Sequence, residues 1–209
     1  MTTKDLLINR LRRDLADCST VLDLGCGPSS LLRHINTIKY SVGVEYWSPS
    51  IETSRRSEIH NHYIQGDICD VKFDTDSFDA VILFDVIEHI EQLEAYRVLQ
   101  RAKVWARKKV IIVVPNGRCE QDTDIDGNLK QQHLSEWSPE ILSSFGFEVS
   151  GFNGWKPLRG EHGNIIPTKT RAIHYLLSGL SEVTDPIVRY CPNRAYHLYA
   201  VWENQRASE

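Results

Sequence analysis

The chain lacks the features of a membrane or secreted protein. No apolar run approaches the roughly 20 residues that a membrane-spanning helix needs, so we expect no membrane insertion. Residues 1–19 mix charges into their apolar positions and contain neither the apolar core nor the small-residue cleavage site of a secretory signal. These absences predict a cytoplasmic protein.

The chain also lacks closely spaced cysteines and an excess of positive charge. The five cysteines are scattered and form no C-x-x-C pair, which predicts free thiols and neither a metal site nor a redox motif. The formal net charge of -4 provides no broad basic field, so binding to long nucleic acid is not expected, although a local basic patch is compatible with this charge.

The length of 209 residues predicts one domain over residues 1–209. Leu7, Leu11 and Leu15 recur at helical spacing, which predicts an amphipathic helix within residues 1–18. The chain is long enough to bury a hydrophobic core around a sheet without disulfides.

Short apolar runs then alternate with helical patterns. Strands are predicted near residues 21–24, 40–45, 62–68, 80–84 and 110–114, and helical segments lie among them. This alternation predicts an α/β fold with a parallel, doubly wound, Rossmann-like sheet in a three-layer α/β/α arrangement. In such a sheet, ligands bind at the carboxyl ends of the strands.

The last third of the chain has a different pattern. A helix is predicted over residues 139–145, and strands over 145–152 and 195–202 are predicted to pair antiparallel, so that the last strand departs from the parallel sheet. The segment 153–194 is too long for a hairpin loop, and we interpret it as an insertion or lid before the last strand.

A glycine-rich turn follows the first predicted strand. Asp23 stands two residues before Gly25, Cys26 and Gly27, whereas a dinucleotide-binding fingerprint would have glycine where Ser30 stands. No Walker lysine follows either. This turn resembles the first motif of the class I S-adenosylmethionine-dependent methyltransferases.

Further strand ends are similar to the same family. The resemblance implies that Glu45 binds both ribose hydroxyls, since two carboxylate oxygens suit a vicinal diol, and that Tyr46 packs on the adenine. It also implies that Asp67 accepts from the adenine amino group while the backbone amide of Ile68 contacts the ring. Taken singly, Glu45 and Asp67 are equally compatible with exposed carboxylates at strand ends.

The methionine part of the cofactor has its own implied partners. The segment with Asp85 resembles the family segment beside the methionine, and Asp23 would favour the ammonium group through water. Glycine permits close approach of the backbone, and amides at the following helix start favour the carboxylate. The predicted cofactor-binding residues are Asp23, Gly25, Cys26, Gly27, Glu45, Tyr46, Asp67, Ile68 and Asp85.

Histidine supplies the candidate general base for a hydroxyl acceptor. The arrangement of the segment after the fifth strand resembles small-molecule methyltransferases, including ones that modify sugars, and implies His133 as the catalytic residue. An alternative is that His133 and Trp137 anchor the next helix. We interpret His89 as structural and expect His60 to face solvent.

Substrate contacts are predicted from the last half of the chain. Asn116 ends the fifth strand, and Lys156 and Arg159 could hold an anionic group or simply be solvated surface charges. The sequence thus predicts an S-adenosylmethionine-dependent methyltransferase with a small-molecule or glycan-linked acceptor, methylated at oxygen. The alternatives are an RNA or protein methyltransferase, a non-catalytic cofactor-binding module and a NAD-dependent oxidoreductase, and the oligomeric state stays open.

Overall fold

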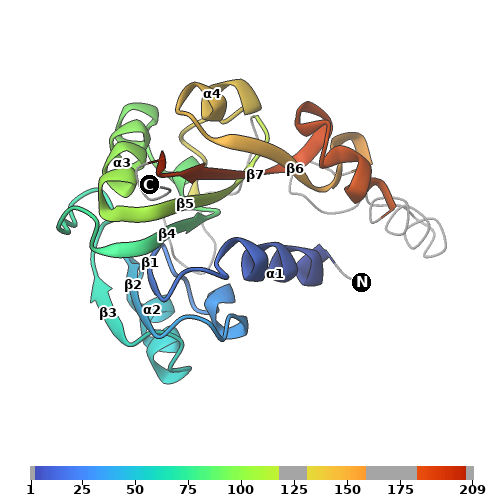
Figure 1. Cartoon of the computed structure of the whole chain (residues 1–209). Helices are drawn as coiled ribbons and strands as arrows, with labels where there is room; N and C mark the ends of the chain where they lie inside the picture. Colours follow the sequence, from blue (N-terminus) through green and yellow to red (C-terminus); the bar gives the residue numbers. More distant parts are fainter. Residues whose placement is uncertain (1–2, 118–130, 159–182, 206–209) are drawn as a thin grey trace. The chain divides into compact units, whose positions relative to one another are not determined.

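The computed structural model describes residues 3–117, 131–158 and 183–205 (Figure 1). In chain order the elements are α1 (Thr3–Asp14), β1 (Thr20–Leu24), η1 (Leu31–His34), β2 (Tyr40–Glu45), α2 (Ser48–Arg56), β3 (His62–Gln65), β4 (Phe78–Phe84), η2 (Ile87–His89), α3 (Gln92–Trp105), β5 (Ala106–Pro115), α4 (Pro139–Ser144), β6 (Glu148–Trp155), η4 (Lys156–Leu158), η5 (Pro192–Arg194) and β7 (Ala195–Glu203). Helical segments separate the strands up to β5, as the hydrophobic patterns predicted, except that β4 follows β3 with no described helix between them.

Seven strands form one sheet in the order β3-β2-β1-β4-β5-β7-β6. Strand β1 pairs in parallel with β2 and β4, and β2 pairs in parallel with β3. Strands β6 and β7 pair antiparallel. The predicted α/β Rossmann-like fold, mostly parallel with an antiparallel pair at the end of the chain, is confirmed.

The register of the parallel strands decides where the candidate residues lie. Leu24 of β1 pairs with Val44 of β2 and with Leu83 of β4, and Val44 pairs with Ile64 of β3. The four strands therefore end at the same edge of the sheet, and the residues that follow them gather there.

Contacts between Cα atoms divide the chain into two compact units. The first comprises Met1–Val86, Leu93–Ile111 and Trp202–Glu209, and the second comprises Ile87–Gln92 and Ile112–Val201. The division passes through β5. The prediction of a single domain over residues 1–209 stays a prediction.

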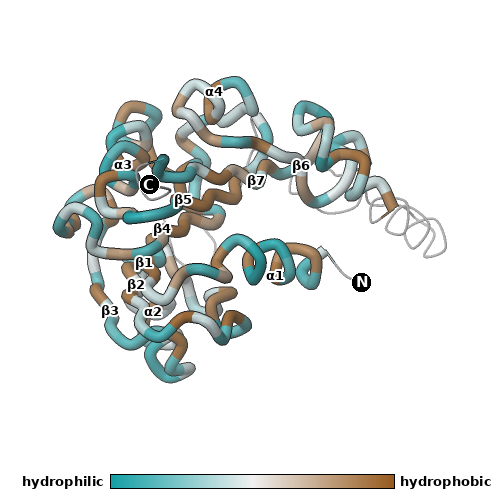
Figure 2. Tube along the Cα trace, in the orientation of Figure 1, coloured by the Kyte–Doolittle hydropathy of each residue, from teal (hydrophilic) through white to brown (hydrophobic). Residues whose placement is uncertain are grey.

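The first unit is built on buried strands. All residues of β4 except the last are buried, and Figure 2 shows hydrophobic residues along β4 and β5. Helix α1 buries Ile8 and Leu11, and Leu15 just beyond it is also buried. Leu7, which was predicted to share a stripe with Leu11 and Leu15, is only half-buried. In the described part of the chain, no helix is both long enough and apolar enough to cross a membrane.

The second unit holds the antiparallel pair. Strand β6 continues to Trp155, so residues 153–155 of the predicted insertion 153–194 belong to a strand. The pairing shifts register between Phe152 and Trp155, where Asn153 and Gly154 have positive φ, so a bulge extends the strand beyond its predicted end. Residues 159–182 lie outside the described residues, and the lid role of the insertion stays a prediction.

The cysteine side chains are free thiols in the described part of the chain. The cysteines at positions 18, 26, 69 and 191 are free in the described part of the chain, as predicted, and Cys119 lies outside it. Cys18 and Cys26 are buried and pack as small apolar residues.

Candidate functional site

The glycine-rich turn after β1 has a conformation that only glycine accommodates well. Gly25 and Gly27 have φ values of +71° and +55°, in the left-handed region. A Cβ on Gly25 would lie 2.4 Å from Cγ2 of Val86. A Cβ on Gly27 would meet no atom of the described residues within 4 Å, so the backbone there is open to a ligand.

Glu45 joins the turn from the end of β2. Its Oε2 accepts from the N–H of Gly27 at 3.0 Å, and its Oε1 accepts from the N–H of Trp47 at 2.7 Å. Both carboxylate oxygens are thereby held in place, and each has a second lone pair for another donor. Tyr46, beside it, is 49% exposed. We name residues 23–27 together with Glu45 the cofactor turn.

Asp23 faces the interior of this turn. Its Oδ2 accepts from Oγ of Ser30 at 2.5 Å and lies 3.5 Å from Nε2 of His60. Burial, joined by the negative charge of Glu45, raises the pKa of the Asp23 carboxyl to about 7, although the hydrogen bond from Ser30 lowers it. The predicted contact of Asp23 with the cofactor ammonium group stays a prediction.

His60 corrects one expectation. It was expected to face solvent, but it is 6% exposed and its Nδ1 lies 3.2 Å from Oγ of Ser41. Burial lowers the pKa of His60 to about 4, so the ring is neutral at physiological pH. The expectation was wrong because the burial of His60 comes from contacts with Asp23 and Ser41, which are distant in the sequence and leave no local pattern around His60.

Cys26 presents its backbone rather than its side chain. The side chain is buried, and its Sγ would lie 2.9 Å from a Cβ on Gly43 of β2. Burial raises the pKa of the Cys26 thiol well above its usual range. Only the main chain of Cys26 is therefore available to a ligand.

The other predicted cofactor residues follow β3 and β4. The Oδ1 of Asp67 accepts from the N–H of Cys69 at 2.9 Å, which closes a tight turn, and Ile68 is buried. Asp85 is exposed and has a φ of +53°, an uncommon conformation for a residue other than glycine. Such strain is concentrated at functional sites, so Asp85 is a candidate on geometric grounds as well.

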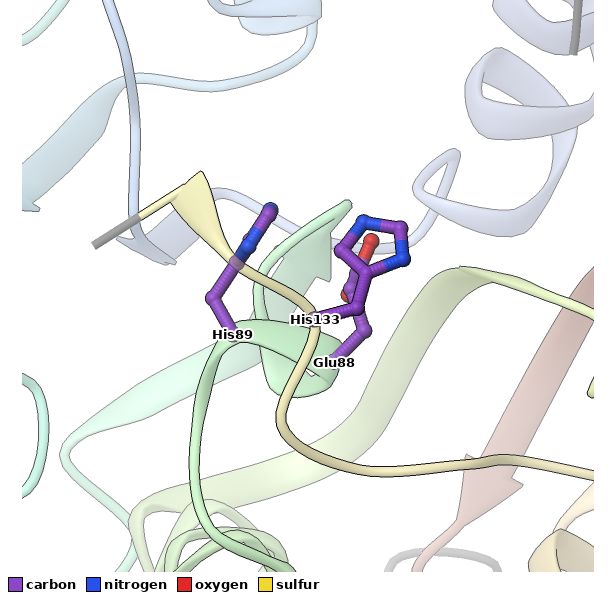
Figure 3. Close-up of side chains that lie close together, drawn as sticks. All are labelled: Glu88, His89 and His133. Atoms are coloured by element: carbon purple, nitrogen blue, oxygen red, sulfur yellow. The ribbon is translucent and has the colours of Figure 1, made fainter. Parts of the chain in front are cut away.

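A second group of side chains surrounds His133. Ligand atoms of Glu88, His89 and His133 lie within 4.8 Å of one another, and the two imidazole rings have centroids 4.9 Å apart (Figure 3). Glu88 is 2% exposed, while both histidines are half-buried. We name these three residues the histidine cluster.

Hydrogen bonds hold the two segments of the histidine cluster together. The N–H groups of Leu134 and Ser135 donate to the carbonyl oxygen of Glu88 at 2.7 and 3.1 Å. Oγ of Ser135 donates to the carbonyl oxygen of Ile87 at 2.9 Å and accepts from Nε1 of the buried Trp137 at 3.0 Å. The segment before α4 is therefore tied directly to η2, and the anchoring alternative for Trp137 agrees with these bonds.

Two of the three predicted substrate residues, Asn116 and Lys156, lie in the described part of the chain. The side-chain amide of Asn116 donates to the carbonyl oxygens of Pro192 and Ala195, at 3.0 and 2.9 Å. Nζ of Lys156 donates to the carbonyl oxygen of Asn116, so these two residues lie together. Arg159 lies outside the described residues. A substrate role for any of the three stays a prediction.

Sequence reasoning did not find the partners of Asp23 or of His133. Ser30 and His60 contact Asp23 from other segments, and Glu88 lies 45 positions before His133. The sequence does show the adjacent pair Glu88 and His89 directly after a buried strand. This pair alone did not indicate that His133 lies beside it.

A known family of protein domains matches the part of the chain that contains the cofactor turn. Residues 22–114 match the family described as "Methyltransferase domain". This segment, which is less than half of the chain, is therefore similar to a methyltransferase domain. It contains every predicted cofactor-binding residue from Asp23 to Asp85, and it also contains Glu88 and His89 of the histidine cluster.

One curated relative is similar over part of its length. An uncharacterised protein of Methanocaldococcus jannaschii is 29% identical over 135 residues, which is 63% of this chain and 54% of that protein. The chain thus spans about half the length of the curated relative it matches.

Solved structures share the fold over most of the chain. An S-adenosylmethionine-dependent methyltransferase from Archaeoglobus fulgidus has a TM-score of 0.61 at 17% identity, over 96% of this chain and 94% of that one. Magnesium protoporphyrin IX methyltransferase from Synechocystis, crystallised with bound S-adenosylmethionine, has a TM-score of 0.50 at 17% identity, over 71% and 69%. The small RNA methyltransferase HEN1 has a TM-score of 0.58 at 17% identity, over 96% of this chain and 25% of that one.

At these identities the structural likeness concerns the fold. The partial match to a methyltransferase domain and the fold shared with solved methyltransferases agree with the family resemblance that the sequence predicted. The neighbouring structures include proteins named for a porphyrin and for RNA, so they do not narrow the class of acceptor.

Proposed function

We propose that the chain transfers the methyl group of S-adenosylmethionine to an oxygen of a small-molecule or glycan-linked acceptor. The observation that carries the cofactor half of this proposal is the bond between the N–H of Gly27 and Oε2 of Glu45. It joins the two motifs, 18 positions apart, that the family resemblance assigns to the cofactor.

The geometry of the cofactor turn suits this ligand. Gly27 leaves its backbone uncovered, and the carboxylate of Glu45 is fixed by two N–H donors while it keeps lone pairs for a ribose diol. Asp67 and Asp85 follow strands that end at the same edge of the sheet as β1 and β2. An extended nucleoside with a charged tail would meet carboxylates and open backbone along that edge.

The acceptor half rests on charge and chemistry. A net charge of -4 disfavours long polyanionic acceptors, and methyl transfer from a sulfonium needs mainly alignment and a dry site. A hydroxyl acceptor also needs a route for its proton, which is the reason that His133 was predicted as a base. Methyl transfer to hydroxylated small molecules, to glycans and to short RNA is measured to test this half of the proposal. Transfer to RNA alone would contradict it.

Calorimetric titration of the chain with S-adenosylmethionine, S-adenosylhomocysteine and NAD tests the cofactor half. We expect a Kd on the order of micromolar for the first two ligands and no binding of NAD. Glu45→Ala removes the acceptors for the ribose diol and is expected to weaken binding by about tenfold or more.

The matched control for Glu45→Ala is Glu52→Ala, because Glu52 is an exposed glutamate of the neighbouring helix α2. It should leave the affinity unchanged. Equal affinities for the Glu45→Ala variant and the unmodified chain would remove Glu45 from the site, and absence of binding by the unmodified chain would overturn the proposal.

A further inference from the structure

We propose that the histidine cluster, Glu88, His89 and His133, binds a divalent transition-metal ion. Two imidazole nitrogens and one carboxylate oxygen from these residues lie within 4.8 Å of one another. This donor set suits Zn²⁺, Mn²⁺, Co²⁺ or Fe²⁺, which accept mixed nitrogen and oxygen ligands. The sequence predicted no metal site because its residues show no local ligand spacing.

The separation of the donors is close to what one ion requires. Metal–ligand bonds of about 2.0–2.2 Å place two ligands of one tetrahedral ion about 3.3–3.6 Å apart. The donors of the cluster, which lie within 4.8 Å of one another, therefore need to approach by at most about 1.5 Å. Figure 3 shows the three side chains projecting to the same side of their ribbons, so rotation of the half-buried histidines provides this approach.

The hydrogen bond of His89 prepares its ring for a metal. Nδ1 lies 3.2 Å from the carbonyl oxygen of Gln132. A carbonyl oxygen only accepts, so Nδ1 carries the proton and Nε2 presents its lone pair. Metal-bound histidines typically donate their other ring N–H to a carbonyl or carboxylate, because this bond fixes the tautomer and the orientation of the ring.

The main chain around the cluster is held in advance of binding. The carbonyl oxygen of Glu88 accepts from the N–H groups of Leu134 and Ser135, and Leu134 directly follows His133. Ser135 adds the bond to Ile87 that joins it to η2. The two segments that supply the ligands thus have little freedom to lose when an ion binds, which favours affinity.

The burial of Glu88 also favours a cation. Glu88 is 2% exposed. A carboxylate that is removed from water is stabilised by a positive charge at short distance. The two imidazoles are neutral when they act as ligands, so the cluster offers one formal negative charge to a doubly charged ion.

Three protein ligands leave coordination positions open for water or a substrate oxygen. A hydroxyl bound at such a position loses its proton more easily, since a metal ion lowers the pKa of bound oxygen. This consequence rests on the proposed function, and it makes His133 a metal ligand in place of a base.

Titration of the full-length chain with Co²⁺, followed by visible absorption and calorimetry, tests the site. We expect about one equivalent to bind with the spectrum of a nitrogen and oxygen site. Glu88→Gln, His89→Gln and His133→Gln are each expected to weaken binding by about tenfold or more. The control is His62→Gln, an exposed histidine of β3, which should bind Co²⁺ as the unmodified chain does.

Paramagnetic broadening by Mn²⁺ gives a second test without any substitution in the cluster. The histidine side-chain resonances of His89 and His133 should disappear at substoichiometric Mn²⁺ while those of His62 persist. The proposal is overturned if the unmodified chain takes up no ion, if a thiolate-to-cobalt charge-transfer band shows that cysteine is the ligand, or if the three variants bind like the control.

The metal titration and the cofactor titration have independent outcomes. Co²⁺ binding is measured in the absence of S-adenosylmethionine, so a chain that binds the cofactor but no metal contradicts only the metal site. A chain that binds Co²⁺ through the cluster but no S-adenosylmethionine contradicts only the proposed function.

Discussion

The cofactor turn and the histidine cluster are both built on hydrogen bonds to the main chain, but they draw on the sequence differently. The cofactor turn takes Asp23 from the end of β1 and Gly25 and Gly27 from the loop that follows it, and adds Glu45 from the end of β2. The histidine cluster takes two ligands from η2 and the third from a segment 44 positions after His89.

This difference shows why one group was predicted and the other was not. In the cofactor turn, parallel register brings successive strand ends to one edge, so order along the chain is enough to predict proximity. In the histidine cluster, proximity depends on bonds from Leu134 and Ser135 to η2, which no periodic pattern announces. Three substitutions probe this comparison.

The largest expected effect is that of Gly25→Ala in the cofactor turn. The new Cβ would lie 2.4 Å from Cγ2 of Val86, and the residue would keep a φ of +71°. Overpacking and left-handed strain together predict a loss of about 3 kcal/mol in the free energy of unfolding, measured by urea denaturation.

Gly27→Ala is the matched control, because its Cβ meets open space and only the φ of +55° is strained. We expect it to cost about 1 kcal/mol. Adding Val86→Ala should restore part of the stability lost in Gly25→Ala. Equal losses at the two glycines would show that contact with Val86 is not the cause.

Ser135→Ala is expected to have the next largest effect, in the histidine cluster. It leaves Nε1 of Trp137 and the carbonyl oxygen of Ile87 without the hydroxyl that they both contact. We expect a loss of about 2 kcal/mol in the free energy of unfolding and about tenfold weaker Co²⁺ binding.

The control for Ser135→Ala is Ser143→Ala, at an exposed position of α4, which should change neither quantity. A stability loss with unchanged Co²⁺ affinity would separate the bonds of Ser135 from the placement of His133.

The smallest expected effect is the pH dependence introduced by Asp23. The pKa of its carboxyl is about 7 in the folded chain against an ordinary value of 3.8, so between these values the folded state holds a proton that the unfolded state has released. Stability from this group is therefore lost as the pH rises through about 7. Asp23→Asn abolishes that loss.

Urea denaturation at pH 5.5 and pH 8 measures the effect. The stability of Asp23→Asn relative to the unmodified chain should rise by on the order of 1–2 kcal/mol between these two values. His60, whose pKa is lowered to about 4, adds stability as the pH rises from 4 towards 6.5, but it does so in both proteins. Parallel pH dependences of the two proteins would show that the Asp23 carboxyl is ionised in the folded chain at pH 5.5.

Much of the fold followed from local patterns. Val21 to Leu24 and Ala80 to Leu83 are buried strand residues whose apolar runs were visible in the sequence, and the antiparallel end of the sheet was predicted from the last two runs. The exact ends were less predictable: β6 continues to Trp155 through a bulge at Asn153 and Gly154, because positive φ at these residues lets the strand resume pairing.

The sequence alone determined the alternation of strands and helices and the place of the cofactor turn, because hydrophobic periodicity and glycine act over a few neighbouring residues. Only the tertiary structure decided that His60 is buried against Asp23 and that His133 meets Glu88 and His89. These contacts join segments far apart in the chain, and they form only once packing and hydrogen bonding have fixed the paths of those segments.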